Sequence, residues 1–301
     1  GRSRPVRTPR TGENDYAIRP LDEAALCALA ARMRRAQRPW AAATVGHRVA
    51  VLREWSGALL GDCKAVLDAL ATDTGRHRLA RSELETLRGL VAGYAALGPQ
   101  LLGPSPERPS VAAGVGIEIQ QVPYPLVGVI SPWNFPFLLS ILDAVPALVA
   151  GCAVIVQPSE VTPRFIAPLM TSIGRFPELA GVLAFIEGDG ESGAALIGCV
   201  DQICFTGSVA TGRKVAEACA RSFIPACLEL GGKDPAIVLA SAEPAQAART
   251  VLRAAVQATG QACQSIERVY VDRASYQPFL EALTHAATRV EFNYPDAHRG
   301  H

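Results

Sequence analysis

The sequence predicts an α/β fold, in which helices precede a mostly parallel sheet and the first part of a second α/β domain follows it. Short apolar runs alternate with helical patterns between residues 126 and 230, which is typical of strand–helix–strand units. A second alternation of this kind begins after residue 233. A chain of 301 residues, 49% hydrophobic and 19% charged, is long enough to bury a core in each domain.

The first hundred residues predict one loop and three helices. Residues 1–20 are polar and contain several Pro and Gly residues, so we expect a surface loop there. Apolar residues at helical spacing then predict a helix from Asp22, a second from Thr44 to Ala71 and a third from Arg78 to Leu97. We interpret these helices as a scaffold that packs against the later sheet.

Residues 101–122 predict an extended ribbon. This segment is rich in Pro and Gly, and polar and apolar residues then alternate from Gly116 to Val122. A period of two predicts a half-exposed strand, and its open edge would favour pairing with another chain. A subunit contact and a plain surface hairpin both fit this pattern.

Residues 126–230 predict a Rossmann-like parallel sheet that binds a nucleotide. The predicted strands are Leu126–Ser131, Ala153–Gln157, Val182–Glu187, Gln202–Phe205 and Ala226–Leu230. The predicted helices run from Phe135 to Ala150, from a cap at Thr162-Pro163, from near Glu191 and from near Ser208. Right-handed crossovers between parallel strands place the ligand-binding loops at the carboxyl ends of those strands.

The residues after Lys233 predict the beginning of a second domain. The predicted elements are a strand at Ala236–Leu239, a helix at Pro244–Ala258, a loop with Cys263, a strand at Arg268–Val271 and a helix at Tyr276–Val290. Two strands and two helices are too few to complete a sheet and cover its faces, so we expect this domain to be incomplete.

The composition favours a small-molecule partner over nucleic acid or a membrane. The formal net charge is +1, from 29 basic and 28 acidic residues, which gives no strong field for an anionic polymer or an anionic lipid surface. The longest apolar run, from Ala144 to Val156, is shorter than the roughly 20 residues of a membrane helix. The eight cysteines show no zinc-ligand spacing, so we expect no metal site and a reducing, cytoplasmic location.

Three motifs carry groups that acyl chemistry at a carbonyl needs. Cys263 ends a Gly-Gln-Ala-Cys turn, Glu229 begins Glu-Leu-Gly-Gly-Lys after an apolar strand, and Asn134 lies between two prolines. A thiolate can attack a carbonyl, an amide can hold the resulting oxyanion, and a carboxylate can activate water. Each also has a structural alternative: a packed cysteine, a surface carboxylate and a helix-capping asparagine.

The three motifs, in this order, resemble the aldehyde dehydrogenase superfamily over about residues 20–298. The resemblance implies that Cys263 is the nucleophile that forms a thiohemiacetal and then a thioester. It implies that Asn134 donates to the oxyanion, and that Glu229 is the general base that hydrolyses the thioester to a carboxylic acid.

The resemblance also implies a domain organisation. Residues 1–100 and 123–230 would form the NAD-binding domain, residues 101–122 an oligomerisation hairpin, and residues 231–301 an incomplete catalytic domain of the aldehyde dehydrogenase type. We expect the complete protein to be a homodimer or a homotetramer.

A Gly-Ser turn that opens a helix predicts a pyrophosphate site, since backbone N–H groups at a helix start favour anions. A simple helix cap is the alternative for Ser208. By resemblance, the expected cofactor-binding residues are Ile130, Trp133, Gln157, Ser159, Glu160, Gly190, Phe205, Thr206, Gly207, Ser208, Leu230 and Gly231. Gly188 would be a neighbour of the cofactor, and Phe135 and Leu138 would line the substrate entrance.

Two positions depart from the family pattern. Gln157 stands where the family has a lysine that contacts the adenosine ribose, whereas Glu160 remains beside it. An acid near the 2′-hydroxyl would repel the extra phosphate of NADP, so NAD is expected over NADP. Asp143 stands where many members carry lysine, so the proton relay of relatives is not transferred to this chain.

We therefore predict an NAD-dependent oxidation of an aldehyde to a carboxylic acid. The alternative is an inactive fragment or pseudoenzyme of the same family that acts as a binding or assembly partner. Gln157 motivates this alternative, as does the lack of the Glu-x-Phe-Gly-Pro segment that touches the nicotinamide ribose in the family. The identity of the aldehyde cannot be read from the sequence.

Overall fold

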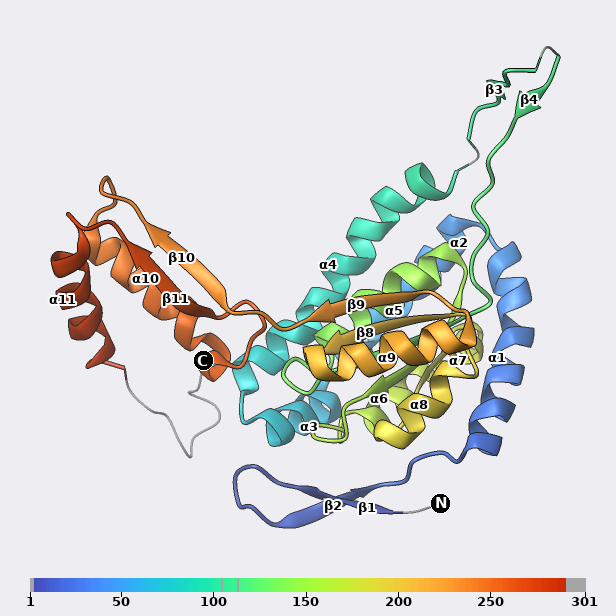
Figure 1. Cartoon of the computed structure of the whole chain (residues 1–301). Helices are drawn as coiled ribbons and strands as arrows, with labels where there is room; N and C mark the ends of the chain where they lie inside the picture. The colour runs from blue at the N-terminus through green and yellow to red at the C-terminus, as the bar shows by residue number, and fades with distance from the viewer. Residues whose placement is uncertain (1–2, 104, 113, 291–301) are drawn as a thin grey trace.

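A five-stranded sheet forms the centre of the protein in the computed structural model, which describes residues 3–103, 105–112 and 114–290 (Figure 1). Its strand order is β7-β6-β5-β8-β9, and every neighbouring pair is parallel. The strands are β5 (Leu126–Ser131), β6 (Ala153–Pro158), β7 (Leu183–Phe185), β8 (Gln202–Gly207) and β9 (Ala226–Leu230). The predicted α/β class is confirmed.

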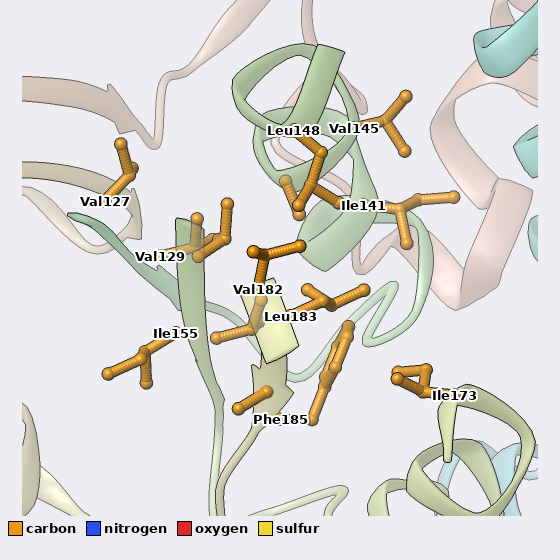
Figure 2. Close-up of a cluster of buried hydrophobic side chains, with 14 of the residues drawn as sticks. Val127, Val129, Ile141, Val145, Leu148, Ile155, Ile173, Val182, Leu183 and Phe185 are labelled. Atoms are coloured by element: carbon orange, nitrogen blue, oxygen red, sulfur yellow. The ribbon is translucent and has the colours of Figure 1, made fainter. Parts of the chain in front are cut away.

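The apolar composition of β5 and β6 follows from their central places in the sheet. Every residue of β6 is buried, and all but one of β5, because helices cover both faces. Figure 2 shows side chains such as Val129 on β5, Ile155 on β6 and Ile141 on a neighbouring helix in this core. Such strands appear in the sequence as continuous apolar runs, which is why the sequence located them well.

Five helices accompany the strands. They are α5 (Leu138–Ala150), α6 (Ile166–Ile173), α7 (Pro177–Val182), α8 (Gly190–Ile197) and α9 (Val209–Ser222). The expected cap at Thr162 is wrong, because its hydroxyl donates to the carbonyl of Trp133 and the helix begins only at Ile166. Helix α5 likewise begins three residues after the predicted start at Phe135, and α7 was not predicted.

The order of the strands creates a switch point between β5 and β8. From β5 the chain adds β6 and β7 on one side, and then crosses to add β8 and β9 on the other side. In an open parallel sheet, a crevice forms outside the carboxyl ends of the two strands at such a point. A ligand site is therefore expected at the loops after Ser131 and Gly207.

Four helices precede the sheet, namely α1 (Glu23–Ala42), α2 (Val45–Gly61), α3 (Lys64–Thr74) and α4 (His77–Leu102). The single helix predicted from Thr44 to Ala71 is wrong. The backbone of Asp62 leaves the helical region, with φ −134° and ψ 55°, so α2 ends there and α3 begins two residues later. This break allows both helices to pack against α4, as Leu59 and Leu70 are fully buried.

The surface loop predicted for residues 1–20 is also wrong, because this segment forms an antiparallel hairpin. Strands β1 (Arg4–Arg7) and β2 (Asn14–Ile18) pair, and Val6 and Ile18 are buried. The hydroxyl of Tyr16 donates to Glu187 at 2.7 Å. The hairpin is held by residues far away in the sequence, so the local pattern of charged and turn residues did not reveal it.

The predicted ribbon is present as a hairpin that projects from the end of α4 (Figure 1). Strands β3 (Arg108–Pro109) and β4 (Gly116–Ile117) pair antiparallel over only two residues each. Ile117 and Val122 are exposed. The apolar side chains of this ribbon are therefore open to contact with another surface.

A second, smaller unit contains the two remaining strands. Strands β10 (Asp234–Val238) and β11 (Ile266–Val271) pair parallel and pack on α10 (Pro244–Val256) and α11 (Tyr276–Ala287). A short helix of the 3-10 type, η1 (Gln257–Gly260), follows α10. The predicted boundary of the catalytic domain at 231–301 includes residues 291–301, which lie outside the described residues.

None of the helices within the described ranges is both long enough and apolar enough to cross a membrane.

Candidate active site

A cavity of about 930 Å³ lies at the carboxyl ends of β5 and β8, where the strand order places the switch point. The segments at the ends of the strands line it, as do residues 260–263. Residues of α8 and α9, such as Ile197 and Val215, form an apolar wall. The starts of α8 and α9, at Gly190 and Ser208, also line the cavity.

Nearly all of the predicted site residues meet at this cavity. Those that line it are Ile130, Trp133, Asn134, Gln157, Ser159, Glu160, Gly190, Phe205, Thr206, Gly207, Ser208, Leu230, Gly231 and Cys263. They come from six segments of the chain that are distant in sequence, so the fold brings together what the motifs only suggested separately. Four of the predicted residues do not line the cavity, namely Glu229, Gly188, Phe135 and Leu138.

The loop that carries the thiol is joined to the segment that carries the amide. The side-chain nitrogen of Asn134 donates to the carbonyl of Gln261 at 2.8 Å, two residues before Cys263. The thiol itself is exposed, with its sulfur 4.0 Å from Oε1 of Gln264. Asn134 does not cap α5, whose first turn starts after Phe137 without a cap from its own segment. The structure thus places the predicted donor beside the predicted nucleophile's loop.

The turn before Cys263 has an unusual backbone. Ala258, Thr259 and Gly260 all have positive φ values, of 54°, 59° and 72°. Glycine adopts this region freely, but a β-branched threonine does so rarely, at a cost of about 1–3 kcal/mol. The sequence indicated the turn at Gly260, but it did not indicate that the two preceding residues share the left-handed conformation.

Glu229 does not line the cavity that Cys263 and Asn134 line. It is exposed on β9, and side chains alternate along a strand, so it points away from the face to which its neighbour Leu230 belongs. Burial raises the pKa of Asp143 on α5, and the negative charge of Glu229 raises it further. Glu229 therefore lies on the α5 side of the sheet.

Gln157 has a structural task at the edge of the cavity. It is only 4% exposed, and its amide nitrogen donates to the carbonyl of Asp189 at 2.9 Å. A Cβ atom on Gly188 would lie 2.5 Å from the side chain of Gln157, so a larger residue there would displace that side chain. The amide oxygen of Gln157 is buried and accepts no hydrogen bond from any described residue.

Asp189 holds the beginning of α8 at the cavity. Its carboxylate accepts hydrogen bonds from the backbone N–H groups of Glu191 and Ser192, both at 3.0 Å, and pairs with Arg4 of the amino-terminal hairpin. Burial raises the pKa of Asp189, but the hydrogen bonds and Arg4 outweigh it and lower the pKa overall. The predicted cofactor neighbour Gly190 is thus the first residue of a helix that Asp189 caps.

Ser208 is a helix cap. Its hydroxyl oxygen accepts from the backbone N–H of Thr211 at 3.2 Å, which is the simpler of the two interpretations of the Gly-Ser turn. Both residues nevertheless line the cavity, so the positive end of the α9 dipole faces it.

Sequence reasoning missed two cations on the same helix. Lys214 and Arg221 line the cavity from α9, together with Val215 and Ala218. The signal was present, because these positions follow Thr211 at helical spacing and therefore share one face of α9. A helical projection from the Gly-Ser turn would have found them.

The sequence matches the aldehyde dehydrogenase family over residues 1–299. The chain belongs to the aldehyde dehydrogenase family. A Mycolicibacterium smegmatis protein named "Putative succinate-semialdehyde dehydrogenase", with NADP(+) in its name, is 36% identical over 282 residues. That alignment covers 92% of this chain and 54% of the relative.

Solved structures agree with this family assignment. A structure described as "Putative Aldehyde Dehydrogenase PutA" from Anabaena variabilis is 47% identical, with a TM-score of 0.96, over 99% of this chain and 64% of the other. An NAD-dependent benzaldehyde dehydrogenase from Corynebacterium glutamicum is 30% identical, with a TM-score of 0.87, over 96% of this chain and 64% of the other. The chain thus spans roughly half to two thirds of the length of its relatives.

In the described part of this aldehyde dehydrogenase chain, no group of three or more His, Cys, Asp or Glu residues is placed to hold a metal ion.

Proposed function

We propose that this chain carries the cofactor site and the nucleophile of an NAD(P)-dependent aldehyde dehydrogenase that oxidises an aldehyde to a carboxylic acid. The observation that carries the proposal is the contact between Asn134 and the loop of Cys263 at the end of the cavity. This contact puts an amide donor beside a thiol, where an attacked carbonyl would need both.

In the proposed reaction, the thiolate of Cys263 attacks the aldehyde carbon and forms a thiohemiacetal. The amide of Asn134 donates to the developing oxyanion, and one such donor is typically worth about 10²–10³ in rate. The nicotinamide cofactor, when bound, takes up the hydride that leaves the former aldehyde carbon. Cys263 then holds the acyl group as a thioester.

We propose Glu229 as the base that removes a proton from the water that hydrolyses this thioester. Its family motif supports the role, as does its position directly before Leu230, which lines the cavity. Its exposure on the α5 side of β9 suits access for water rather than contact with the cofactor. The products are the carboxylic acid and the free thiol of Cys263.

The residues at the cavity fit a nicotinamide dinucleotide. The unpaired buried oxygen of Gln157 matches a hydroxyl donor such as that of the adenosine ribose, and the α8–α9 wall matches an adenine ring. The start of α9 at Ser208 would receive the pyrophosphate. We propose NAD over NADP, since the carboxylate of Glu160 on the wall would repel a 2′-phosphate.

Replacement of the thiol tests the proposal. We expect Cys263→Ser to lower the formation of NADH from NAD and an aldehyde panel by roughly 10³-fold or more, because a hydroxyl supplies almost no nucleophile at neutral pH. The measurement is NADH absorbance, with the exposed Cys27→Ser as the matched control. Equal turnover of Cys263→Ser and the parent would refute the nucleophile assignment.

We also propose that the β3–β4 hairpin contacts another subunit in a homodimer or homotetramer, because its exposed Ile117, Ile119 and Val122 would be covered there. A cytoplasmic location is proposed as well, and the eight free cysteines support it.

A further inference from the structure

Two charged side chains, one just before α4 and one within it, are buried beside segments of the candidate site. Arg76 is 4% exposed and lies just before the first residue of α4, and Glu83 is 3% exposed and lies about two turns later. Neither residue lines the cavity. A buried charge is costly unless hydrogen bonds satisfy it, so the partners of these two groups are informative.

Arg76 joins the amide segment to the turn before the thiol. One end of its guanidinium donates to the backbone carbonyl of Asn134, and the other nitrogen donates to the backbone carbonyl of Ala258 at 3.3 Å. The same group lies over the ring of Phe135, with 5.3 Å between its carbon and the ring centre. A single side chain therefore contacts two segments that are distant in sequence, residues 134–135 and Ala258.

Glu83 holds the other end of the amide segment. Its carboxylate accepts from the backbone N–H groups of Phe137 at 3.1 Å and Leu138 at 2.9 Å. These are N–H groups at the start of α5, which has no side-chain cap of its own. Glu83 is thus a cap supplied by another helix, and it fixes where α5 begins.

The two hydrogen bonds of Arg76 fall on the backbone of the two segments that position the amide of Asn134 and the thiol of Cys263. Asn134 carries the amide, and Ala258 is the first of the three residues with positive φ that lead to Cys263. A strained turn persists only where its surroundings hold it, and the Ala258 carbonyl is held by Arg76. The planar guanidinium can bind both carbonyls at once, which a lysine ammonium does less well.

We propose that Arg76, with Glu83, is a positioning residue that sets the distance between the amide of Asn134 and the thiol of Cys263. This inference rests on the proposed roles of Asn134 and Cys263. Arg76 touches neither the substrate nor the cofactor site, and it acts through the backbone of the two residues' segments.

The kinetic test compares kcat with KM. A misplacement of about 1 Å can cost about 10²-fold in rate, so we expect Arg76→Gln to lower kcat by roughly 10- to 100-fold. The KM for NAD should stay within about two-fold, because Arg76 is not part of the cavity wall. Arg76→Lys should recover part of the loss. Arg78→Gln, an exposed neighbour on the same helix, is the control that should leave kcat unchanged.

A double-mutant cycle tests whether Arg76 acts through Asn134. If it does, Arg76→Gln should lower kcat much less in an Asn134→Ala background than in the parent, because the donor that it positions is already absent. Additive losses in the two backgrounds would mean that Arg76 acts elsewhere, and would overturn the proposal.

Amide hydrogen exchange provides a test that needs no turnover. We expect Arg76→Gln to speed exchange in peptides that cover residues 134–138 and 258–264, while peptides of the buried strand β6 keep the exchange of the parent. If the parent has no dehydrogenase activity but exchange in both segments becomes faster, the proposed function fails and the positioning role of Arg76 stands. Unchanged exchange in the two segments overturns the positioning role, whatever the activity.

Discussion

Gln157 shows how one residue can depart from a family pattern and still serve the same site. By resemblance, Gln157 replaces a lysine that contacts the adenosine ribose. In the structure, its side chain donates to the Asp189 carbonyl and lies against Gly188. Its unpaired oxygen then remains for a ligand. The residue type could be read from the sequence, but its task depends on a loop about thirty positions away.

Glu83 gives a pH prediction at the level of one side chain. Burial is the main cause that raises its pKa from 4.5 to about 7, and the N–H groups of Phe137 and Leu138 and the charge of Arg76 only partly oppose it. The folded state therefore holds this proton more tightly than the unfolded state. The resulting stabilisation is complete below pH 4.5 and is lost as the pH rises through about 7.

Comparison with Glu83→Gln isolates this effect, because glutamine keeps an acceptor oxygen but does not ionise. We expect the free energy of unfolding of the parent, relative to the variant, to fall by up to roughly 3 kcal/mol between pH 4.5 and about 7. Urea unfolding at several pH values measures it, and Glu85→Gln on the exposed face of α4 is the control. A difference that does not change with pH would contradict the prediction.

Some residues of the candidate site can be recognised from their neighbours in the sequence, and others cannot. Cys263, Asn134 and Ser208 stand in short motifs whose turns and helix starts are decided by neighbours in the sequence, and the structure places all three at one cavity. Arg76 and Glu83 could not be predicted, because their partners lie 58 and 54 positions away. The sequence around a charged residue does not indicate which distant backbone groups its side chain will hydrogen-bond.

The elements follow the same distinction. Strands β5 and β6 were predicted nearly to the residue, since their burial on both faces fixes an apolar run. The break between α2 and α3 and the β1–β2 hairpin were missed, since packing against distant elements decides both. Local propensity says little where tertiary contacts are decisive.

One mostly buried arginine joins the amino-terminal hairpin to α3. Arg164 follows β6, is 9% exposed, and pairs with Asp15 of the hairpin and with the fully buried Asp73 of α3. Burial is the largest influence on the pKa of Asp73 and raises it, and Arg164 acts in the opposite direction. Removal of the cation would leave this buried carboxylate without a counter-ion, since among the described residues only the backbone N–H of residue 164, at 2.9 Å, would still donate to it.

We therefore expect Arg164→Met to lower the free energy of unfolding by about 3–5 kcal/mol at neutral pH. Chemical denaturation followed by circular dichroism measures it. Arg175→Met is the matched control, since Arg175 pairs with Asp62 at 3.7 Å on the surface, where such a pair is worth about 0–1 kcal/mol. Similar losses for both variants would show that the buried network does not anchor the hairpin.

At the scale of the whole molecule, the two units are unequal in how well they are covered. The central sheet has helices on both faces, whereas α10 and α11 pack on only one face of β10 and β11. Among the described residues of this small unit, the buried apolar cluster is Val238, Ala248, Val251 and Phe279. A two-stranded sheet with one covered face is marginal by itself.

The open face of this small sheet is apolar. Ile237 is 72% exposed and lies directly across from Tyr270, which is also exposed, and Leu239 continues the row. These side chains alternate with those that face the helices, such as Val238. Neighbouring exposed apolar residues of this kind favour association between molecules.

We predict that the 301-residue chain self-associates through this face, and that Ile237→Thr weakens the association by about tenfold. Threonine keeps the β-branch that suits a strand, but it removes apolar area, and full burial of such a side chain is worth about 1.5–3 kcal/mol, where 1.4 kcal/mol is tenfold in affinity. Sedimentation velocity over a range of concentrations measures it. Val161→Thr also replaces an exposed apolar β-branched residue with threonine, but at a loop position, and should sediment like the parent. If Ile237→Thr also sediments like the parent at every concentration, association does not use this face, and the uncovered side of β10 and β11 is tolerated in water.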